Sequence, residues 1–565
     1  MLAAVIGLGL IGQTASAAAA EPAVSSASEL APDSTDAARV APNADRSVDG
    51  DANFATFDSP QGLPIRRVEI LPRNIYDPLP PGRLQPIYRL ANGLHLRTRV
   101  RTIRDQLLFA RGEPWSDALG RETARALRAL DILDPYRLEA RRAGDSVDVR
   151  IETRDAWTTA PELTLESSGG EHFSAFSVIE RNVLGLGKAV SLVYREAPEG
   201  LTRSIFYDDP NVLGSRLRLN VMGATGTDGA SHRLSTRVPF YAEDTPFSYG
   251  VSWGLVTSLA RLFQSGREMA SFDRRVEQTE VFWGRGDRVG KGIVRVIWSF
   301  HVQDRRFGPS RLESGAPAAY EGGEENLATR RLAGELQAWR PRFVEKRGVE
   351  RLDGIEDFDL GSSLRFMAGV SPELLGGTTD EGYVAARWDA GVENDRLGFG
   401  TASLDVTSRL RHDPRELIAH ANARWTNQSL LRQTLVVAAH GSVGHRVPRD
   451  YQVIVGGLNG LRAYPVRALA GQQVWRFNAE HRWPVASRLY QLVSVGAAAF
   501  YDAARTWGPG ADGVAWHHDV GLGMRLSLPN SRLARVARFD VAWPISPTRD
   551  GRRVPVFSFG SGQAF

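Results

Sequence analysis

The stretch VWRFNAEHRW, from Val474 to Trp483, alternates large apolar side chains with polar ones. In an extended chain the two kinds fall on opposite sides, with Trp475, Phe477 and Trp483 on one side and Arg476, Asn478, Glu480 and Arg482 on the other. Because successive side chains of a β-strand point to opposite faces, this period of two predicts a strand. Such a strand fits a soluble sandwich as well as a membrane barrel with a polar lumen.

The same alternation recurs from about residue 161 to the last residue, Phe565. Examples are KAVSLVYREA, SRLRLNVMGAT, SYGVSWGLVTS, QTLVVAAHGSVG and RFDVAWPI. Membrane strands need about 9 to 11 residues, and up to about 20 candidates of this kind can be counted. So many strands exceed an ordinary sandwich, and closing the sheet removes its unpaired edges. We therefore expect a mainly β protein in which residues 161–565 form a transmembrane antiparallel β-barrel.

Composition removes several classes of function. The chain has 565 residues, no cysteine and a net charge of +4. Without cysteine, disulfides and thiolate chemistry are excluded. The basic residues are interleaved with acidic ones rather than clustered, which argues against a nucleic-acid partner. After the N-terminus, no apolar run approaches the roughly 20 residues that a membrane helix needs.

Two short motifs suggest chemistry that their context contradicts. Residues 250–254 read GVSWG, which resembles the G-x-S-x-G turn around a hydrolase serine, here Ser252. That turn joins a strand to a helix, whereas this segment lies inside a strand pattern. His517, His518 and Asp519 are adjacent, and adjacent strand residues face opposite sides, so they cannot all bind one metal ion. We expect no enzyme activity, no metal and no cofactor.

The first 60 residues predict export. MLAAVIGLGLIGQTASAAAA is a short apolar run followed by small residues, which is typical of a signal peptide over residues 1–20. Its G-x-G-x-x-G pattern resembles a dinucleotide site, but the βαβ unit that such a site needs does not follow. Residues 21–60 are rich in Ala, Asp, Ser and Pro and predict a disordered linker.

Residues 62–157 predict a small α+β domain. IRRVEI, from Ile65 to Ile70, alternates like a strand, and RVRTIRDQLLFARG places apolar residues at helical spacing. Ser116 and Asp117 are N-cap candidates for a second helix. YRLEARRAG and SVDVRIETRD then predict a β-hairpin. The order β-α-α-β-β, with LLFARGEPW between the helices and GDSVDVRIETRD at the end, resembles a single POTRA (polypeptide-transport-associated) domain.

The loop VGGLNGLRAYPV, residues 455–466, carries a second resemblance. Its residues Leu461, Arg462, Ala463 and Tyr464 resemble the V-R-G-F/Y motif of the BamA/TamA superfamily (bacterial surface antigen type), outer-membrane assembly barrels preceded by POTRA domains. In that family the motif lies in a long loop that folds into the lumen, and five strands follow it. Five strand candidates also follow here. RNVLGLGKAVSL, YDDPNVLGSRLRL and VGLGMRLSLP resemble further motifs of these barrels, which have 16 strands by this resemblance.

The same resemblance implies a partner for Arg462. The family motif F/G-x-D-x-G corresponds to Phe500 and Asp502, with Ala504 in place of glycine. Alternation in LVSVGAAAFYDAA turns Asp502 into the lumen, and Glu480 points inward from the neighbouring strand. A guanidinium in a partly dry lumen needs a carboxylate, and its planar fork suits a bidentate one. We hypothesise that Arg462 pairs with Asp502, with Glu480 as a further partner; the alternative is a solvated loop arginine.

The chain ends in VPVFSFGSGQAF, in which Phe557, Phe559 and Phe565 share one face of a last strand. This resembles the signal that outer-membrane barrels present to their assembly machinery, although an ordinary edge strand can also end in phenylalanine. Gly560 and Gly562 weaken the pairing of this strand. We therefore expect the barrel to open at the seam between this strand and the first one, near ELTLES.

Together, these resemblances imply a bacterial outer-membrane barrel with a periplasmic POTRA domain that inserts proteins into the membrane or moves them across it. Expected partners are outer-membrane lipid, unfolded outer-membrane or secreted client proteins, and periplasmic proteins that bind the POTRA domain by strand addition. Two alternatives stay open. One is a passive pore or lipid-handling channel, and the other is a structural surface-antigen barrel with one fixed periplasmic partner.

Overall fold

The computed structural model describes residues 54–563 except 59, 131, 169–170, 198–199, 353–354, 430–432, 458, 491–492, 512, 529–535, 548–552 and 562. The predicted signal peptide, most of the predicted linker, Gly562 and Phe565 therefore lie outside the described residues. Within the described part, no helix is both long and apolar enough to cross a bilayer.

The N-terminal domain is a four-stranded sheet with three helices. The sheet has the order β1-β3-β4-β2, in which β3 and β4 are antiparallel and the outer pairs are parallel. Its elements are β1 (Phe54–Phe57), β2 (Ile65–Arg73), α2 (Gln85–Leu94), α3 (Val100–Arg104), α4 (Asp117–Ala129), β3 (Leu133–Ala143) and β4 (Ser146–Asp155). Apolar side chains from every element except α2 form one core, in which Ile103, Trp115 and Leu127 are almost fully buried.

This domain differs from the predicted β-α-α-β-β order in three places. Strand β1 lies within the segment predicted to be linker, and it pairs with β3, so the domain extends to Phe54. Helix α2 occupies a segment for which no helix was predicted; a proline in its first turn favours helix there. The predicted first helix is shorter than expected and ends as α3 at Arg104. After it, backbone hydrogen bonds join residues three apart instead of four, and the resulting tight turn places Leu107 in the core. The second helix begins after Ser116, as predicted.

Among the described residues after the N-terminal domain, 21 strands form one closed antiparallel barrel; β14 has only two residues and pairs with β12. The count of about 20 agrees with the strand periodicity and exceeds the 16 that the resemblance implies. The strands are β5 (Thr159–Ser168), β6 (Glu171–Glu180), β7 (Ala189–Ala197), β8 (Gly200–Asp209), β9 (Arg218–Gly226), β10 (Gly229–Val238), β11 (Phe247–Gln264), β12 (Arg267–Val289), β13 (Gly292–Phe307), β14 (Arg311–Leu312), β15 (Glu325–Arg340), β18 (Ser362–Ser371), β19 (Glu381–Asn394), β20 (Gly398–Leu410), β21 (Pro414–Asn427), β22 (Thr434–His445), β25 (Gln473–Leu489), β26 (Val493–Trp507), β27 (His517–Ser527), β28 (Ala537–Pro544) and β29 (Val556–Ser561).

The barrel closes between its last and first strands. Among the described residues, β29 meets β5 in a single register pair, Phe559 with Ser167, whereas β29 pairs with β28 along its whole length. The junction at which the sequence analysis expects the barrel to open is thus the pairing of β29 with β5, and its opening stays a prediction. Leaving out the two-residue strand β14, this junction has fewer described register pairs than any other junction between neighbouring barrel strands.

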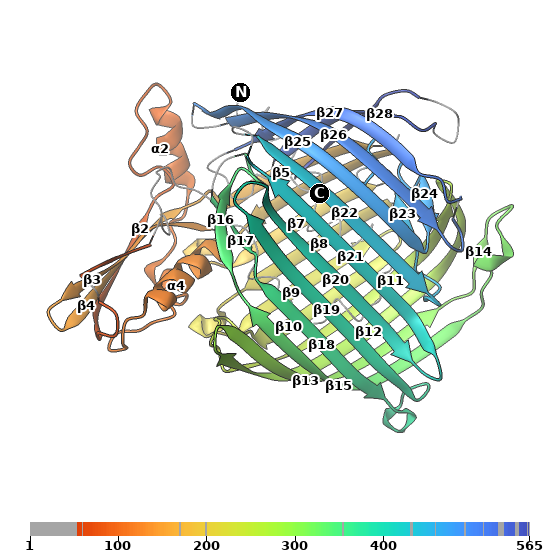
Figure 1. Cartoon of the computed structure of the whole chain (residues 1–565), viewed down its shortest axis with the longest axis horizontal. Coiled ribbons are helices and arrows are strands. Elements are labelled where there is room, and N and C mark those ends of the chain that lie inside the picture. Colours follow the sequence, from red (N-terminus) through yellow and green to blue (C-terminus); the bar gives the residue numbers. More distant parts are fainter. Residues whose placement is uncertain are drawn as a thin grey trace.

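The N-terminal domain sits at one end of the barrel, called here the domain end (Figure 1). The domain contacts two turns of the barrel that have the same sequence, Asn-Val-Leu-Gly, at residues 182–185 and 211–214. The backbone N–H of Arg99 and the hydroxyl of Thr102 both donate to the carbonyl of Gly185 at 2.9 Å. On the other side, Arg125 in α4 pairs with Glu243 in the β10–β11 turn at 2.9 Å. These polar contacts hold the domain against the barrel rim.

A small hairpin, β16 (Phe343–Arg347) and β17 (Ile355–Asp359), connects β15 to β18 at the domain end. Its strands contact α4, where Arg128 donates to both carboxylate oxygens of Asp357 at 2.9 and 3.2 Å. Its tip reaches into the barrel, and Val349 there is fully buried. The hairpin thus links the N-terminal domain to the lumen.

Candidate functional site in the barrel lumen

The segment between β22 and β25 forms a loop that enters the lumen from the far end, opposite the N-terminal domain. Its strands β23 (Val453–Val455) and β24 (Leu469–Gly471) pair with each other and lie at the far end (Figure 1). Arg462 lies between them in the chain. Gly457 and Gly460 have φ of +62° and +97°, a region that favours glycine. These glycines let the chain turn sharply just before Arg462.

Arg462 is buried and held by carboxylates on the barrel wall. Its Nε and Nη2 donate to the two carboxylate oxygens of Asp502 at 2.7 and 2.9 Å. Its Nη1 donates to Glu480 at 2.9 Å. Arg462 is 2% exposed, and Glu480 and Asp502 are fully buried. The structure therefore brings together the three residues that the sequence hypothesis joined, with Asp502 as the bidentate partner.

The network is larger than the sequence hypothesis. Arg462 Nη1 also lies 3.3 Å from Asp540, and Arg525 bridges Asp540 at 2.6 Å and Glu480 at 3.0 Å. Arg482 donates to Glu480 at 2.9 Å. We define the arginine cluster as these buried residues from the loop and from β25 to β28: Arg462, Glu480, Arg482, Asp502, Arg525, Arg538 and Asp540. Mutual hydrogen bonds offset part of the cost of burying so many charges.

Neighbours of Arg462 fix the loop by further contacts. The Arg462 guanidinium carbon lies 3.3 Å from the ring centroid of Phe500, a cation–π contact. The backbone N–H of Ala463 donates to Asp519 at 3.0 Å. The Tyr464 hydroxyl lies 3.1 Å from the carbonyl oxygen of His518 and 2.8 Å from that of Ser546, so its one proton is within donating distance of both. Each residue from 462 to 464 thus has a partner on the barrel.

Small residues make room for the cluster. Ala463 and Ala504, which replace the family's glycines, are both buried in one apolar group together with Leu461 and Phe500. Gly521 lies opposite Phe500 on the next strand, and a methyl group there would overlap the Phe500 ring. Ala463 and Ala504 therefore fit their positions. Gly521 has no side chain, and the Phe500 ring occupies the space that a side chain there would fill.

Alternation along each strand explains which residues the prediction found and which it missed. Asp502 and Glu480 face the lumen, as their strand patterns predict. Asp540 and Arg525 face it too, by the same period of two in β28 and β27. They lie on strands far along the chain from Arg462, so no local spacing connects them with it. Their inward facing was readable from the sequence, but their proximity to Arg462 was not.

The base of the loop is fastened separately at the far end. Gln452 donates to the carbonyl of Phe263 at 2.6 Å and accepts the Phe263 N–H at 2.8 Å. Arg449 donates to the carbonyl of Gly308 at 3.0 Å and lies over the ring of Phe272. The loop is thus bound both at its base and at the segment of Arg462.

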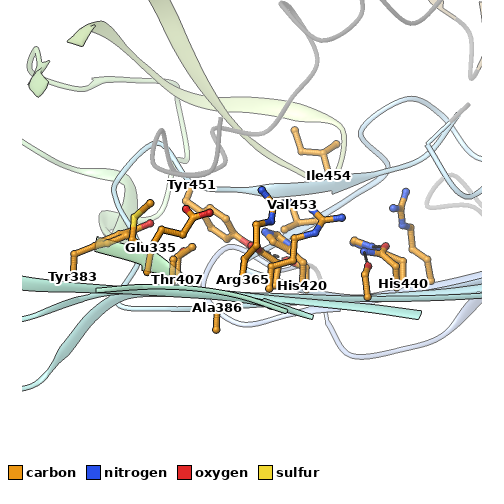
Figure 2. A pocket seen from close by; sticks show the side chains of 18 of the residues that line it. Glu335, Arg365, Tyr383, Ala386, Thr407, His420, His440, Tyr451, Val453 and Ile454 are labelled. Carbon is orange, nitrogen blue, oxygen red and sulfur yellow. Dashed lines mark hydrogen bonds between the residues drawn. The ribbon is translucent and has the colours of Figure 1, made fainter. Parts of the chain in front are cut away.

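A cavity of about 470 Å³, with both polar and apolar side chains in its lining, separates the loop from the wall formed by β15, β18–β22 and β25. In Figure 2, Glu335, Arg365 and His420 project from the wall toward the β23 residues Val453 and Ile454. A second cavity of about 990 Å³ extends from here to α4 at the domain end. The two share lining residues, so the space around the loop is continuous with that below the N-terminal domain.

Other sequence candidates lie elsewhere. Phe557 and Phe559 share the outward face of β29, and the Phe559 ring lies 4.6 Å from that of Phe539, centroid to centroid. Gly560 lies in the same strand, at the seam. Ser252 is in the middle of β11, where no strand-to-helix turn occurs. Asp519 faces the lumen, whereas His518 bonds the Tyr501 hydroxyl, with 2.7 Å between Nδ1 and Oη.

Comparison with known proteins gives one family match and several distant structural similarities. Residues 419–565 match the Omp85 superfamily domain. The fold is similar to BamA from Haemophilus ducreyi lacking POTRA domains 1–3, at 12% identity and a TM-score of 0.41 over 89% of this chain and 85% of that chain. It is also similar to CdiB from Acinetobacter baumannii, at 12% identity and a TM-score of 0.42 over 89% and 74%. No curated protein matches the sequence.

The matched residues coincide with the part of the barrel that holds the site. They begin in β21 and include the inward-folded loop and the five strands that follow it. Every residue of the arginine cluster lies within this range. The additional strands, relative to the expected 16, all precede the loop.

Proposed function

We propose that this chain, an outer-membrane β-barrel whose residues 419–565 are an Omp85 superfamily domain, inserts proteins into the bacterial outer membrane or translocates them across it. The observation that carries the proposal is the seam. Strand β29 joins β5 by one described register pair, next to four strands that the arginine cluster locks together. A weak junction beside a rigid block opens in preference to the rest of the wall.

An open seam supplies what an incoming client strand needs. Separating β29 from β5 exposes a row of backbone N–H and C=O groups on each strand. An extended client segment can pair with either edge by main-chain hydrogen bonds, without a specific side-chain sequence. Because the seam runs through the membrane, a client strand paired there already lies at membrane depth. This route supports insertion over passage through the lumen, which the loop occupies.

The N-terminal domain supports the delivery of clients. Its sheet has the nine-residue strand β2 at one edge and the four-residue β1 at the other. In this proposal the domain is POTRA-like and periplasmic, and the edge of β2 accepts an extended client segment or a periplasmic partner. The contacts of α2, α3 and α4 with the barrel turns dock the domain on the barrel rim.

A disulfide across the seam tests the proposal. Because the chain has no cysteine, the double variant Ser167→Cys with Phe559→Cys can link β5 to β29 at their paired residues. We expect the oxidised protein in vesicles to stop accelerating the folding of an unfolded outer-membrane protein, and reduction to restore it. The control places the pair at Val281 and Phe300, register partners of β12 and β13. Equal activity of the oxidised seam variant and the oxidised control overturns the insertion proposal.

The continuous cavities favour a second candidate, a channel for small solutes or lipid. In that case the purified barrel conducts ions in a planar bilayer but leaves client folding unchanged. A structural barrel with one fixed partner gives neither effect and retains a single periplasmic protein through its N-terminal domain. Measuring folding, conductance and retention on the same preparation separates the three.

A further inference from the structure

The segment around α2 carries basic residues and no acidic ones. Between Pro78 and Arg104 it carries no aspartate or glutamate, and its six arginines are Arg83, Arg89, Arg97, Arg99, Arg101 and Arg104. All six side chains are exposed. A run of this kind attracts an anionic surface.

Helix α2 also exposes an apolar face. Ile87, Leu90 and Leu94, spaced by three and four residues, are 50%, 62% and 68% exposed, and Leu96 just beyond the helix is 60% exposed. Residues with this spacing lie on one side of a helix. The α2 residue that is buried is Tyr88, whose side chain turns toward the barrel. The helix is therefore held from one side and presents its leucines on another.

The contacts of this segment place it at the rim of the barrel wall. Tyr88 donates its hydroxyl to the carbonyl of Tyr490 in the β25–β26 turn at 3.2 Å. Arg99 donates to the carbonyl of Leu184 in the β6–β7 turn at 3.0 Å. Helix α4 lines the cavity below the lumen, whereas α2 stands nearer to the edge of the barrel (Figure 1).

The outer surface of the barrel is apolar near its contact with α2. At the domain end of β25, Val485, Leu489 and Tyr490 are exposed. Farther along the same wall, an apolar groove is lined by Val495, Leu522 and Phe557, among others. These residues face lipid in a membrane barrel. A helix at the rim of such a wall meets the headgroups of the adjoining leaflet.

We propose that α2 and its flanking arginines bind the surface of the leaflet at the domain end, with the leucines in the headgroup–acyl boundary and the arginines on anionic phospholipid. Interfacial helices combine an apolar face with basic residues in this way. The anchoring holds the N-terminal domain against the membrane beside the seam. The inference requires the barrel to reside in a membrane, and it does not depend on whether the barrel inserts proteins.

A fluorescent probe at Leu90 tests the inference in the full chain. The single variant Leu90→Cys is labelled with an environment-sensitive dye and reconstituted in phosphatidylcholine vesicles, with or without phosphatidylglycerol, that carry a quencher on some acyl chains. Asp145→Cys, on the exposed β3–β4 turn of the same domain, is the control. We expect the Leu90 probe to be quenched several-fold more strongly than the control, and more strongly with phosphatidylglycerol than without it.

Two further measurements sharpen the result. Replacing Arg83, Arg89 and Arg97 by glutamine removes exposed charges without touching the domain core, and we expect it to abolish the effect of phosphatidylglycerol. Equal quenching of the Leu90 and Asp145 probes in all vesicles overturns the inference. The inference is also overturned if vesicles leave the Leu90 probe exposed and only an unfolded client protein shields it, because the apolar face then binds protein instead of lipid. Client folding, measured in parallel, reports separately on the proposed function.

Discussion

Arg462 illustrates how one residue holds a loop of the barrel. Its guanidinium meets Asp502 with two hydrogen bonds and Glu480 with a third, while Phe500 covers its face. Replacing it with alanine leaves buried carboxylates without their cation, and we expect the folded barrel to lose about 3 to 5 kcal/mol. Lysine keeps the charge but not the planar fork, so Arg462→Lys is expected to lie between wild type and alanine.

Urea unfolding of the barrel, followed by its mobility in gels of unheated samples, measures these losses. The control is Arg285→Ala, which breaks the exposed pair with Asp287 and is expected to cost no more than about 1 kcal/mol. If Arg462→Ala unfolds at the same urea concentration as this control, the loop is not held by the arginine cluster.

Gly521 gives a second prediction at the scale of one residue. A methyl group at this position would overlap the ring of Phe500 and the carbonyl of Val541. We expect Gly521→Ala to destabilise the barrel by about 1 to 3 kcal/mol, because the ring must move away from Arg462. Gly334→Ala, in β15, meets no atom within 4 Å and serves as the control. Equal stability of the two variants argues against close packing around Phe500.

At the scale of elements, the contact between α4 and the β10–β11 turn is expected to depend on pH. Burial raises the pKa of Glu122, whose carboxylate accepts the backbone N–H of Glu243 at 2.6 Å. A raised pKa means that the docked state favours the protonated carboxyl. Glu122 therefore contributes fully to the stability of the docked state at pH values below the pKa of the undocked side chain. This contribution is lost as the pH rises through the raised pKa of the docked side chain.

Hydrogen exchange of the β10–β11 turn at several pH values checks this dependence. We expect protection to be greater at acidic than at neutral pH in the wild type. In Glu122→Gln, which keeps the hydrogen-bond acceptor without the charge, the protection is expected to change less with pH. Asp145→Asn, on the exposed β3–β4 turn, should behave like the wild type. A Gln variant with the same pH profile as the wild type contradicts the role of Glu122.

At the scale of the whole molecule, the β16–β17 hairpin connects the N-terminal domain to the arginine cluster. At one end of the hairpin, Asp357 pairs with Arg128 of α4. At its tip, the carbonyl of Val349 accepts a hydrogen bond from Nη1 of Arg482 at 2.8 Å. Replacing residues 343–359 with a short turn removes this obstruction from the lumen. We expect a larger single-channel conductance in planar bilayers, because the domain end of the barrel is then wider.

The matched control for the hairpin deletion is Arg128→Ala. This change separates α4 from the hairpin but leaves the tip beside Arg482, so the conductance is expected to stay near that of the wild type. Conductance that is unchanged by removing the hairpin shows that the inward-folded loop alone closes the lumen. Folding of each variant is verified beforehand by its mobility in unheated gels.

The sequence by itself determined the class of fold and the direction of the important side chains. A period of two assigns every strand residue to the lumen or to the outside, so the inward facing of Glu480 and Asp502 follows from their own segments. The same period, with turn residues between segments, yields the number of strands more accurately than the family resemblance did. These properties are local, since they depend on residues within one strand.

Only the tertiary structure decided which inward-facing residues meet. Asp540 and Arg525 reach Arg462 because the registers of β25 to β28 stack their inward positions side by side, and no spacing along the chain specifies that alignment. The course of the β16–β17 hairpin into the lumen and the position of α2 at the rim likewise depend on contacts between distant segments. Alternation specifies the face that a side chain occupies, whereas the register between strands, set by the packing of the closed barrel, specifies its neighbours.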